Sequence, residues 1–471
     1  MKIEQIYTGC LAQGAYYIES NGEAAIVDPL REYKPYLDRL HKSKAKLKYV
    51  LETHFHADFV SGHLDLARHT GAKIVYGPSA KAEFDLYEAK DNEMLPLGNV
   101  FIKVLHTPGH TMESSCFLVI DEHGKEHALF SGDTLFIGDV GRPDLAQKGD
   151  ITQEVLAGYL FDSLRNKVMT LQEDVIVYPG HGAGSACGKN MSSETIDTIG
   201  HQLKNNYALR ANMTREEFVK EVLTGLMPPP AYFPKNAAMN KMDSQSFMEV
   251  MERGSRPLDV ASFRFIAEET DALILDTRKP EEFVNGFIPG SINIGLDGNF
   301  APWAGALIPD LKQEILLVTE PGREEEVITR LSRVGFDYTI GYLEGGFSTY
   351  LASGEKVDSI ESIDVAELRR RVDKDPHTAL LDVRRKSEYD AEHVLNTEVA
   401  PLDYINESMS KIHKNQDTFV YCAGGYRSVI FISILKARGF ENLINVKGGF
   451  NAIKDSGLFN VSAFHAPTSL L

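Results

Sequence analysis

The chain has 471 residues, enough for about three domains, and its 43% hydrophobic and 25% charged content is typical of a folded globular protein. Lys and Arg total 49 against 67 Asp and Glu, so the net charge of −18 disfavours binding to nucleic acids or anionic membranes, which both attract positive charge. The apolar runs are too short for membrane spans, and the N-terminus lacks a signal-peptide core. Four cysteines do not suggest a disulfide framework, so we expect a protein of the reducing cytoplasm.

The first predicted domain, residues 1–245, alternates β-type runs with helical stretches and contains most of the histidines. The β-like run 47–51 is followed by His54, His56 and Asp58, three residues whose side chains bind metals. Because they follow a strand end at positions i, i+2 and i+4, these side chains can converge on one point. This is the strongest local signal in the sequence.

Three further candidates lie later in the same region, each in a Gly- or Pro-rich turn directly after an apolar run. Ordered turns of this kind can present a side chain to a cleft. Each turn alone has an ordinary structural interpretation, but together with the first motif they indicate a metal site. The residues are His110, Asp133 and His181.

In this order the residues resemble the metallo-β-lactamase superfamily over about residues 1–240, which implies an αββα sandwich with a metal site at the edge of its two sheets. The common two-metal form reads His-x-His-x-Asp-His, whereas Phe59 stands at the sixth position here, so we expect one metal per chain. The resemblance then implies His54, His110 and Asp133 as ligands, a set that suits Fe(II), with zinc as the rival. The remaining motif residues would orient these ligands or contact substrate: His56, Asp58 and His181.

Within the superfamily, residues 138–144 (GDVGRPD) are similar to the persulfide dioxygenases, which oxidise the outer sulfur of a thiol persulfide to sulfite with Fe(II) and O2. The resemblance implies that Arg142 contacts a carboxylate of the thiol substrate, the alternative being a surface salt bridge. Cys187 lies six residues after His181 in a glycine-rich loop. It is a candidate substrate-proximal thiol or persulfide acceptor, or else a small buried hydrophobe.

The rest of the chain contains an internal repeat of about 100 residues. Asp-x-Arg occurs at 276–278 and again at 382–384, and Gly-Gly-Phe occurs at 345–347 and again at 448–450. Each copy alternates short apolar strands with amphipathic helices, which predicts an α/β domain with a mostly parallel sheet. The predicted domains are residues 255–355 and 360–471.

The second copy carries the loop 421–428 (YCAGGYRS), in which Cys422 ends an apolar strand and a helix begins near Ser428. The thiol therefore lies at a helix N-terminus among backbone N–H groups, with Arg427 closing the loop, and these features favour a nucleophilic thiolate. The loop resembles that of rhodanese sulfurtransferases. Its six residues match their length, whereas related phosphatase loops are one residue longer, so we expect a persulfide on Cys422. The loop residues expected to bind substrate are Ala423, Gly424, Gly425 and Tyr426.

The first copy has Glu320 at the position of the cysteine, in the carboxylate-rich segment 320–326 (EPGREEE). A loop of this composition cannot support a thiolate-type anion site. This copy resembles an inactive rhodanese domain, and we expect it to be architectural or to form a subunit contact in a homo-oligomer.

The combination resembles bacterial persulfide dioxygenase–sulfurtransferase fusion proteins. It implies Fe(II)- and O2-dependent oxidation of a persulfide of glutathione or another small thiol to sulfite, with sulfur transfer through Cys422 that forms or consumes thiosulfate. Two alternatives remain: a zinc thioester hydrolase of the glyoxalase II kind, which Phe59 disfavours, and a sulfane-sulfur sensor without turnover.

Overall fold

The computed structural model describes residues 1–147, 149–375 and 377–465, and the chain divides into two compact units near residue 250. The first unit contains two six-stranded sheets, each with its strands in sequence order. The first sheet consists of β1 (Lys2–Thr8), β2 (Gln13–Ser20), β3 (Glu23–Val27), β4 (Lys46–Leu51), β5 (Lys73–Tyr76) and β6 (Tyr87–Glu88). The second consists of β7 (Met94–Leu97), β8 (Val100–His106), β9 (Ser115–Ile120), β10 (Glu126–Gly132), β11 (Ile176–Pro179) and β12 (Asp197–Thr198).

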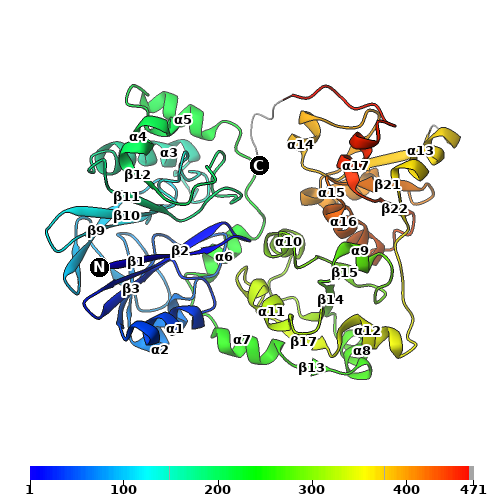
Figure 1. Cartoon of the computed structure of the whole chain (residues 1–471), viewed down its shortest axis with the longest axis horizontal. Coiled ribbons are helices and arrows are strands. Elements are labelled where there is room, and N and C mark those ends of the chain that lie inside the picture. Colours follow the sequence, from blue (N-terminus) through cyan, green and yellow to red (C-terminus); the bar gives the residue numbers. More distant parts are fainter. Residues whose placement is uncertain (148, 376, 466–471) are drawn as a thin grey trace. The chain divides into compact units, whose positions relative to one another are not determined.

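Helices cover the outer faces of both sheets, as Figure 1 shows for α1 and α2 below the first sheet and α3 to α5 above the second. They are α1 (Lys34–Ser43), α2 (His63–Thr70), α3 (Gln153–Ser163), α4 (Ile199–Asn205) and α5 (Arg215–Leu223). A π-helical turn, η1 (Leu164–Val168), extends α3, and η2 (Tyr207–Leu209), α6 (Phe233–Met239) and α7 (Phe247–Gly254) complete the described helices of this region.

Strand β2 shows how the layers are built. Tyr16 and Ile18 pack between the two sheets, against Phe117 and Phe130 of the second sheet. The alternate residue Tyr17 faces the helical layer. Because successive side chains of a strand point to opposite faces, the continuous apolar run 15–18 of β2 is buried on both sides of the sheet. The predicted αββα sandwich is confirmed.

The second unit contains two five-stranded sheets, in which all the pairings between strands are parallel. The first has the order β13-β17-β16-β14-β15, and its strands are β13 (Pro257–Leu258), β14 (Leu273–Asp276), β15 (Ile292–Asn293), β16 (Ile315–Val318) and β17 (Thr339–Leu343). The second has the matching order β18-β22-β21-β19-β20, and its strands are β18 (Ser362–Ile363), β19 (Ala379–Asp382), β20 (Glu398–Val399), β21 (Thr418–Tyr421) and β22 (Leu443–Val446). The repeat in the sequence is thus a repeat of topology.

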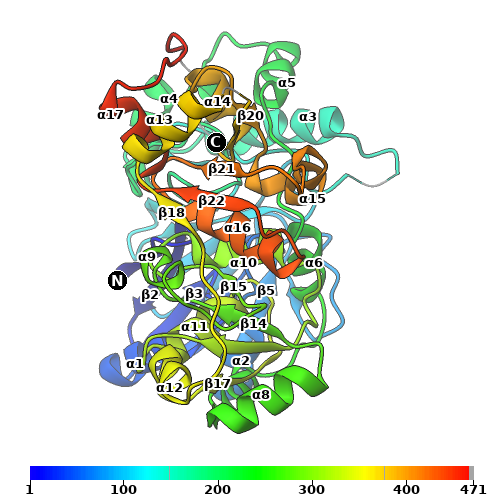
Figure 2. The same ribbon diagram turned by 90° about the vertical axis from the view of Figure 1, so that its right-hand side faces the viewer.

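The helices of the second unit connect these parallel strands, and Figure 2 shows α16 beside β15. In the first copy they are α8 (Val260–Glu269), α9 (Pro280–Phe283), α10 (Phe300–Leu307), α11 (Glu324–Ser332) and α12 (Gly346–Ala352). In the second copy they are α13 (Val365–Lys374), α14 (Lys386–Ala391), η3 (Leu402–Tyr404), α15 (Ile405–Ser408), η4 (Met409–Lys411), α16 (Tyr426–Ala437) and α17 (Gly449–Ser456).

The two sequence landmarks of each repeat touch one another. In the second copy Arg384 donates to Asp382 at 2.7 Å, and its guanidinium lies 3.9 Å from the centre of the Phe450 ring. In the first copy Arg278 donates to Asp276 at 2.6 Å and lies over the Phe347 ring. In each copy the recurring residues therefore form a buried ion pair stacked on an aromatic ring. This contact joins β14 to α12 in the first copy and β19 to α17 in the second.

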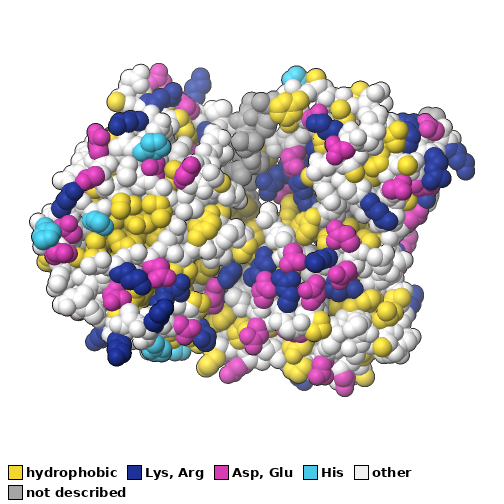
Figure 3. Space-filling model, viewed as in Figure 1, with side chains coloured by type: hydrophobic (Ala, Val, Ile, Leu, Met, Phe, Trp, Pro, Cys, Tyr) yellow, Lys and Arg dark blue, Asp and Glu magenta, His cyan; other side chains and the backbone are white. Residues whose placement is uncertain are grey.

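None of the described helices is long and apolar enough to cross a membrane. On the face drawn in Figure 3, Lys and Arg side chains are interspersed with Asp and Glu.

Replacing Asp382 with Ala leaves the buried guanidinium of Arg384 without its carboxylate, and breaking a buried pair in this way costs about 3–5 kcal/mol. We expect the free energy of unfolding of the second unit, measured by urea denaturation, to fall by that amount. Asp390→Ala is the matched control, because Asp390 forms an exposed ion pair with Lys386 that is worth at most about 1 kcal/mol. Equal losses in the two variants would contradict the prediction.

Candidate metal centre and sulfur-transfer loop

The loop after β4 is held by Asp28, the residue that follows β3. The Asp28 carboxylate accepts hydrogen bonds from the backbone N–H and the hydroxyl of Thr53, both at 2.8 Å. The Thr53 hydroxyl has then given its proton to Asp28, so it accepts from Nδ1 of His54 at 3.0 Å. This chain of hydrogen bonds leaves Nε2 of His54 unprotonated and free to bind a metal.

His54, His110 and Asp133 lie together in one buried group. Oδ2 of Asp133 is 3.4 Å from Nε2 of His110 and 3.9 Å from Nε2 of His54. Nδ1 of His110 lies 2.8 Å from the carbonyl oxygen of Arg142, which can only accept, so His110 also presents an unprotonated Nε2. Burial, and then the nearby charge of His56, lower the pKa of His54 well below its usual range, which keeps it in the neutral form that ligates metals.

The free oxygen of Asp133 supports this interpretation. Oδ2 of Asp133 is buried and has no hydrogen-bond partner, although a buried carboxylate oxygen ordinarily has one. Nε2 atoms of two imidazoles face the same oxygen. The three side chains therefore fit a divalent metal bound by two histidines and one carboxylate.

His181 supports Asp133 from the other side. Its Nδ1 lies 2.8 Å from Oδ1 of Asp133, and its Nε2 lies 2.7 Å from Oδ2 of Asp58. Burial alone would lower the pKa of His181, but the two carboxylates outweigh it and raise the pKa to about 10. Both ring nitrogens are thus occupied by carboxylates, and His181 orients the candidate ligand Asp133.

The expected convergence of His54, His56 and Asp58 on one point is wrong. The structure places them in three different buried groups: His54 with His110, Asp58 with His181, and His56 with Asp28 and Glu52. Nε2 of His56 lies 3.1 Å from Asp28 and 3.3 Å from Glu52, and its ring stacks on Phe59 at 4.2 Å between centroids.

Electrostatics account for the position of His56. Burial would lower its pKa, but Asp28 and Glu52 raise it well above the usual range, while burial raises the pKa of Glu52 to about 7. Neither Asp28 nor Glu52 was predicted from the sequence. The only sequence signal for these two residues is their position, because Glu52 lies two residues before His54 and Asp28 directly follows an apolar run.

The guanidinium of Arg142 is bound within the protein. It forms two hydrogen bonds with Asp144, at 2.6 and 2.7 Å, and it donates to the carbonyl oxygens of Ala186 and Met227. Its own carbonyl oxygen orients His110. The structure therefore gives Arg142 a role in holding the metal centre, and a contact with substrate stays a prediction.

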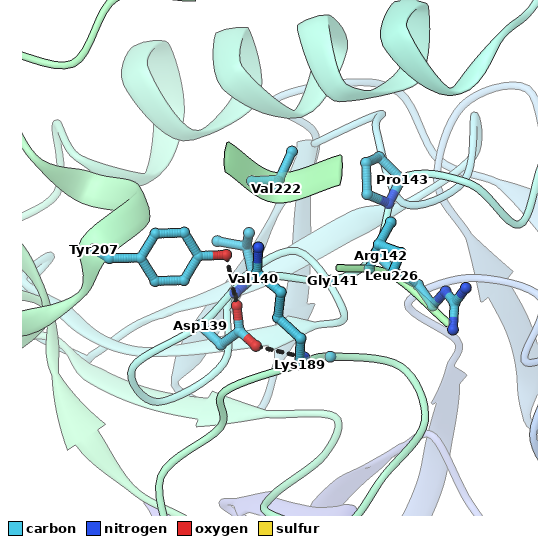
Figure 4. Close-up of a pocket in the computed structure, with 10 residues that line it drawn as sticks. Asp139, Val140, Gly141, Arg142, Pro143, Lys189, Tyr207, Val222 and Leu226 are labelled. Atoms are coloured by element: carbon cyan, nitrogen blue, oxygen red, sulfur yellow. Dashed lines mark hydrogen bonds between the residues drawn. The ribbon is translucent and has the colours of Figure 1, made fainter. Parts of the chain in front are cut away.

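A small pocket lies beside this segment (Figure 4). At its centre, Asp139 accepts hydrogen bonds from the hydroxyl of Tyr207 at 2.9 Å and from the backbone N–H of Lys189 at 2.7 Å. These bonds join the loop that carries Arg142 to the loop that follows Cys187.

Cys187 is buried and forms a possible ligand group with Asp58 and His181. Burial, followed by the charges of Asp58 and Asp133, raises the pKa of its thiol well above the usual range, so the thiol is neutral. The structure brings Cys187 to the edge of the metal centre, and its role as a persulfide acceptor stays a prediction.

In the second unit, Cys422 directly follows β21 and is buried. Its Sγ accepts a hydrogen bond from the backbone N–H of Gly425 at 3.1 Å, and the hydroxyl of Ser428 lies 3.7 Å away. Gly425 has a φ of 107°, which glycine adopts readily. The helix begins at Tyr426, two residues earlier than predicted, because Gly425 completes the turn of the chain.

Gly449 of the Gly-Gly-Phe landmark explains the close packing behind the loop. A Cβ at this position would lie 2.2 Å from the carbonyl oxygen of Cys422, which leaves room only for glycine. The next backbone N–H, of Phe450, donates to that same carbonyl at 2.6 Å.

The side chains of Arg427 and Tyr426 have hydrogen-bond partners outside the loop. Arg427 forms a bidentate ion pair with Glu388, at 2.5 and 2.8 Å. The hydroxyl of Tyr426 donates to the carbonyl oxygen of Gly295 at 2.7 Å. Substrate contacts by Ala423, Gly424, Gly425 and these side chains stay predictions. In the first copy, the corresponding Glu320 is paired with Arg323.

Comparison with known proteins agrees with this architecture. Residues 8–181 match the Metallo-beta-lactamase superfamily, and residues 260–353 and 364–456 match the Rhodanese-like domain. A probable hydroxyacylglutathione hydrolase of Schizosaccharomyces pombe is 32% identical over 42% of this chain and 75% of its own length. The hydroxyacylglutathione hydrolase GloC of Haemophilus influenzae is 31% identical over 41% of this chain and 96% of its own.

Among solved structures, a metallo-beta-lactamase from Staphylococcus aureus subsp. aureus COL is 30% identical with a TM-score of 0.64, covering 73% of this chain and 98% of its own. The chain therefore belongs to the metallo-β-lactamase superfamily. Its particular form is an enzyme with a metal-binding metallo-β-lactamase domain followed by two rhodanese-like domains.

His110→Ala removes one of the three converging ligands. Removal of a residue that only orients a ligand lowers metal affinity roughly 10- to 100-fold, and we expect loss of the ligand itself to lower the affinity further. The variant should therefore retain much less metal than wild type after dialysis, measured by inductively coupled plasma mass spectrometry. His63→Ala is the control, because His63 is equally buried but lies outside the ligand group. Metal retained by the His110 variant would refute the ligand assignment.

Proposed function

We propose that the chain oxidises the persulfide of a small thiol such as glutathione to sulfite with Fe(II) and O2, and transfers sulfur through a persulfide on Cys422 to form or consume thiosulfate. The observation that carries this proposal is the composition of the metal group. Two imidazoles and one carboxylate converge, while His56 and His181 are each bound between carboxylates and Phe59 replaces a further imidazole.

This ligand set supports one metal with several open coordination positions. Two histidines and one carboxylate are typical of non-haem Fe(II) sites, where open positions admit both O2 and a substrate. His54 and His110 would hold the metal through Nε2 and Asp133 through Oδ2. When bound, Fe(II) supplies the activation of O2 and the oxidation of the outer sulfur.

The side chains around the site hold the ligands in place. His181 fixes Asp133, and the carbonyl of Arg142 fixes the ring of His110. The burial of His54, His110 and Asp133 limits access of bulk water. The reaction balances as persulfide, O2 and one water giving thiol, sulfite and two protons.

The loop of the second rhodanese-like domain supports the transfer step. Sulfite attacks the outer sulfur of a Cys422 persulfide, a new S–S bond forms thiosulfate, and the old S–S bond breaks with its electron pair left on Sγ. The N–H of Gly425 and the N-terminus of α16 stabilise that developing thiolate. The reverse step loads Cys422 from thiosulfate.

A second candidate is hydrolysis of a glutathione thioester by the first domain. The relatives in Schizosaccharomyces pombe and Haemophilus influenzae are named as hydroxyacylglutathione hydrolases, which favours it. Such chemistry relies on a metal-bound hydroxide and generally on the fuller two-metal ligand set. Phe59 and the position of His56 count against it.

The test is oxygen uptake by anaerobically purified, Fe(II)-loaded protein with glutathione persulfide, with sulfite and thiosulfate quantified. We expect wild type and Cys422→Ser to take up O2 at equal rates and form sulfite, and thiosulfate to form mainly in wild type. His110→Ala should abolish uptake. Absence of iron-dependent uptake, with hydrolysis of a glutathione thioester by the zinc-loaded protein, would establish the second candidate instead.

A further inference from the structure

The rhodanese-like copy without a cysteine contacts the loop of the copy that has one. The hydroxyl of Tyr426, the first residue of α16, donates to the carbonyl of Gly295 at 2.7 Å. The aromatic ring lies against Gly298, where an added Cβ would come within 2.4 to 2.8 Å of the ring and its hydroxyl. The slot that receives Tyr426 therefore exists because Gly298 has no side chain.

The slot is a built feature of the first copy. Arg330 of α11 is buried and donates to the carbonyl oxygens of Leu296, at 2.7 Å, and Gly298, at 3.2 Å. These bonds hold both sides of the slot. A second contact lies seven residues along α16, where the hydroxyl of Ser433 accepts from the backbone N–H of Asn293 at 2.9 Å. The first copy thus holds α16 at two points, two helical turns apart.

Tyr426 is placed to transmit this anchoring to the sulfur. It directly follows Gly425, whose N–H donates to Sγ of Cys422. Gly424 and Gly425 have no side chains of their own to limit the loop, so an unanchored loop would sample many backbone conformations in which this N–H points elsewhere. A fixed Tyr426 restricts Gly425 to the conformation that donates to the sulfur.

We propose that the cysteine-free rhodanese-like copy positions the Cys422 loop, with Tyr426 as the positioning residue and Gly298 as the residue that makes room for it. This inference rests on the proposed sulfur transfer for its biological purpose, but the reactivity of Cys422 tests it independently. It assigns a function to a domain that has no nucleophile of its own.

The test uses the full chain and two substitutions on opposite sides of the contact. Tyr426→Phe removes only the hydroxyl, and Gly298→Ala adds a methyl group where the ring lies. The control is Gly286→Ala in the same copy, where a Cβ would meet only ordinary contacts, at 3.4 Å from the Phe347 ring. The readout is the rate at which iodoacetamide alkylates Cys422, followed by mass spectrometry of its peptide across a pH series.

We expect both test variants to alkylate about threefold to tenfold more slowly at neutral pH, the range that loss of one hydrogen bond to the sulfur implies. The pH at half-maximal rate should rise, because loss of an N–H donor disfavours the thiolate. Sulfur transfer from thiosulfate to cyanide should fall in parallel, while oxygen uptake by the first unit stays unchanged. Gly286→Ala should behave as wild type.

A double variant separates positioning from general damage. In a Tyr426→Ala background the ring is gone, so adding Gly298→Ala should produce no further slowing. A further slowing there, wild-type alkylation by both single variants, or an equal loss in Gly286→Ala would overturn the inference. If wild type transfers no sulfur but the alkylation rates still differ as expected, the proposed function fails and the positioning role stands.

Discussion

His56 and His181 each lie between two buried carboxylates, and this pairing determines which groups are left to bind a metal. An unpaired charge in such a site would cost several kcal/mol, so each imidazole that is paired to carboxylates is held there strongly. Asp28 with Glu52 binds His56, and Asp58 with Asp133 binds His181. What remains is the second oxygen of Asp133 and the unprotonated nitrogens of His54 and His110.

Two other residues, Asp28 and Arg142, each make two contacts that hold the loops around the site in place. Asp28 is both the partner of His56 and the acceptor for Thr53, so the loop after β4 is tied to the end of β3. Arg142 holds its segment through Asp144 while its carbonyl orients His110. The candidate ligands His54, His110 and Asp133 are thereby positioned by residues outside their group, which is the usual basis of a preorganised site.

The two rhodanese-like copies share a scaffold and differ in the loop. The buried Asp-x-Arg pair and the phenylalanine beneath it are present in both, so the scaffold does not depend on a thiol. With Glu320 in place of a cysteine, the first copy keeps its fold and presents a slot that receives Tyr426. The chain therefore has one rhodanese-like domain with a cysteine in this loop and one without a cysteine that contacts the loop.

The sequence by itself determined the repeated parallel sheets and the positions of the turns that carry His54, His110, Asp133 and Cys422, because apolar periodicity and glycine-rich turns act over a few residues of chain. The αββα sandwich was implied by the resemblance of the histidine and aspartate motifs to the metallo-β-lactamase superfamily. Only the tertiary structure decided that the side chains of the His54 motif diverge, because their partners come from other strands.

The contact between Tyr426 and Gly295 joins residues 131 positions apart. No local pattern encodes such a pair, since its formation depends on how two complete domains pack and on an absent side chain at Gly298. Backbone conformation depends mainly on neighbouring residues in the sequence. The hydrogen-bond partner of a buried polar group depends instead on which residues the complete fold places within hydrogen-bonding distance.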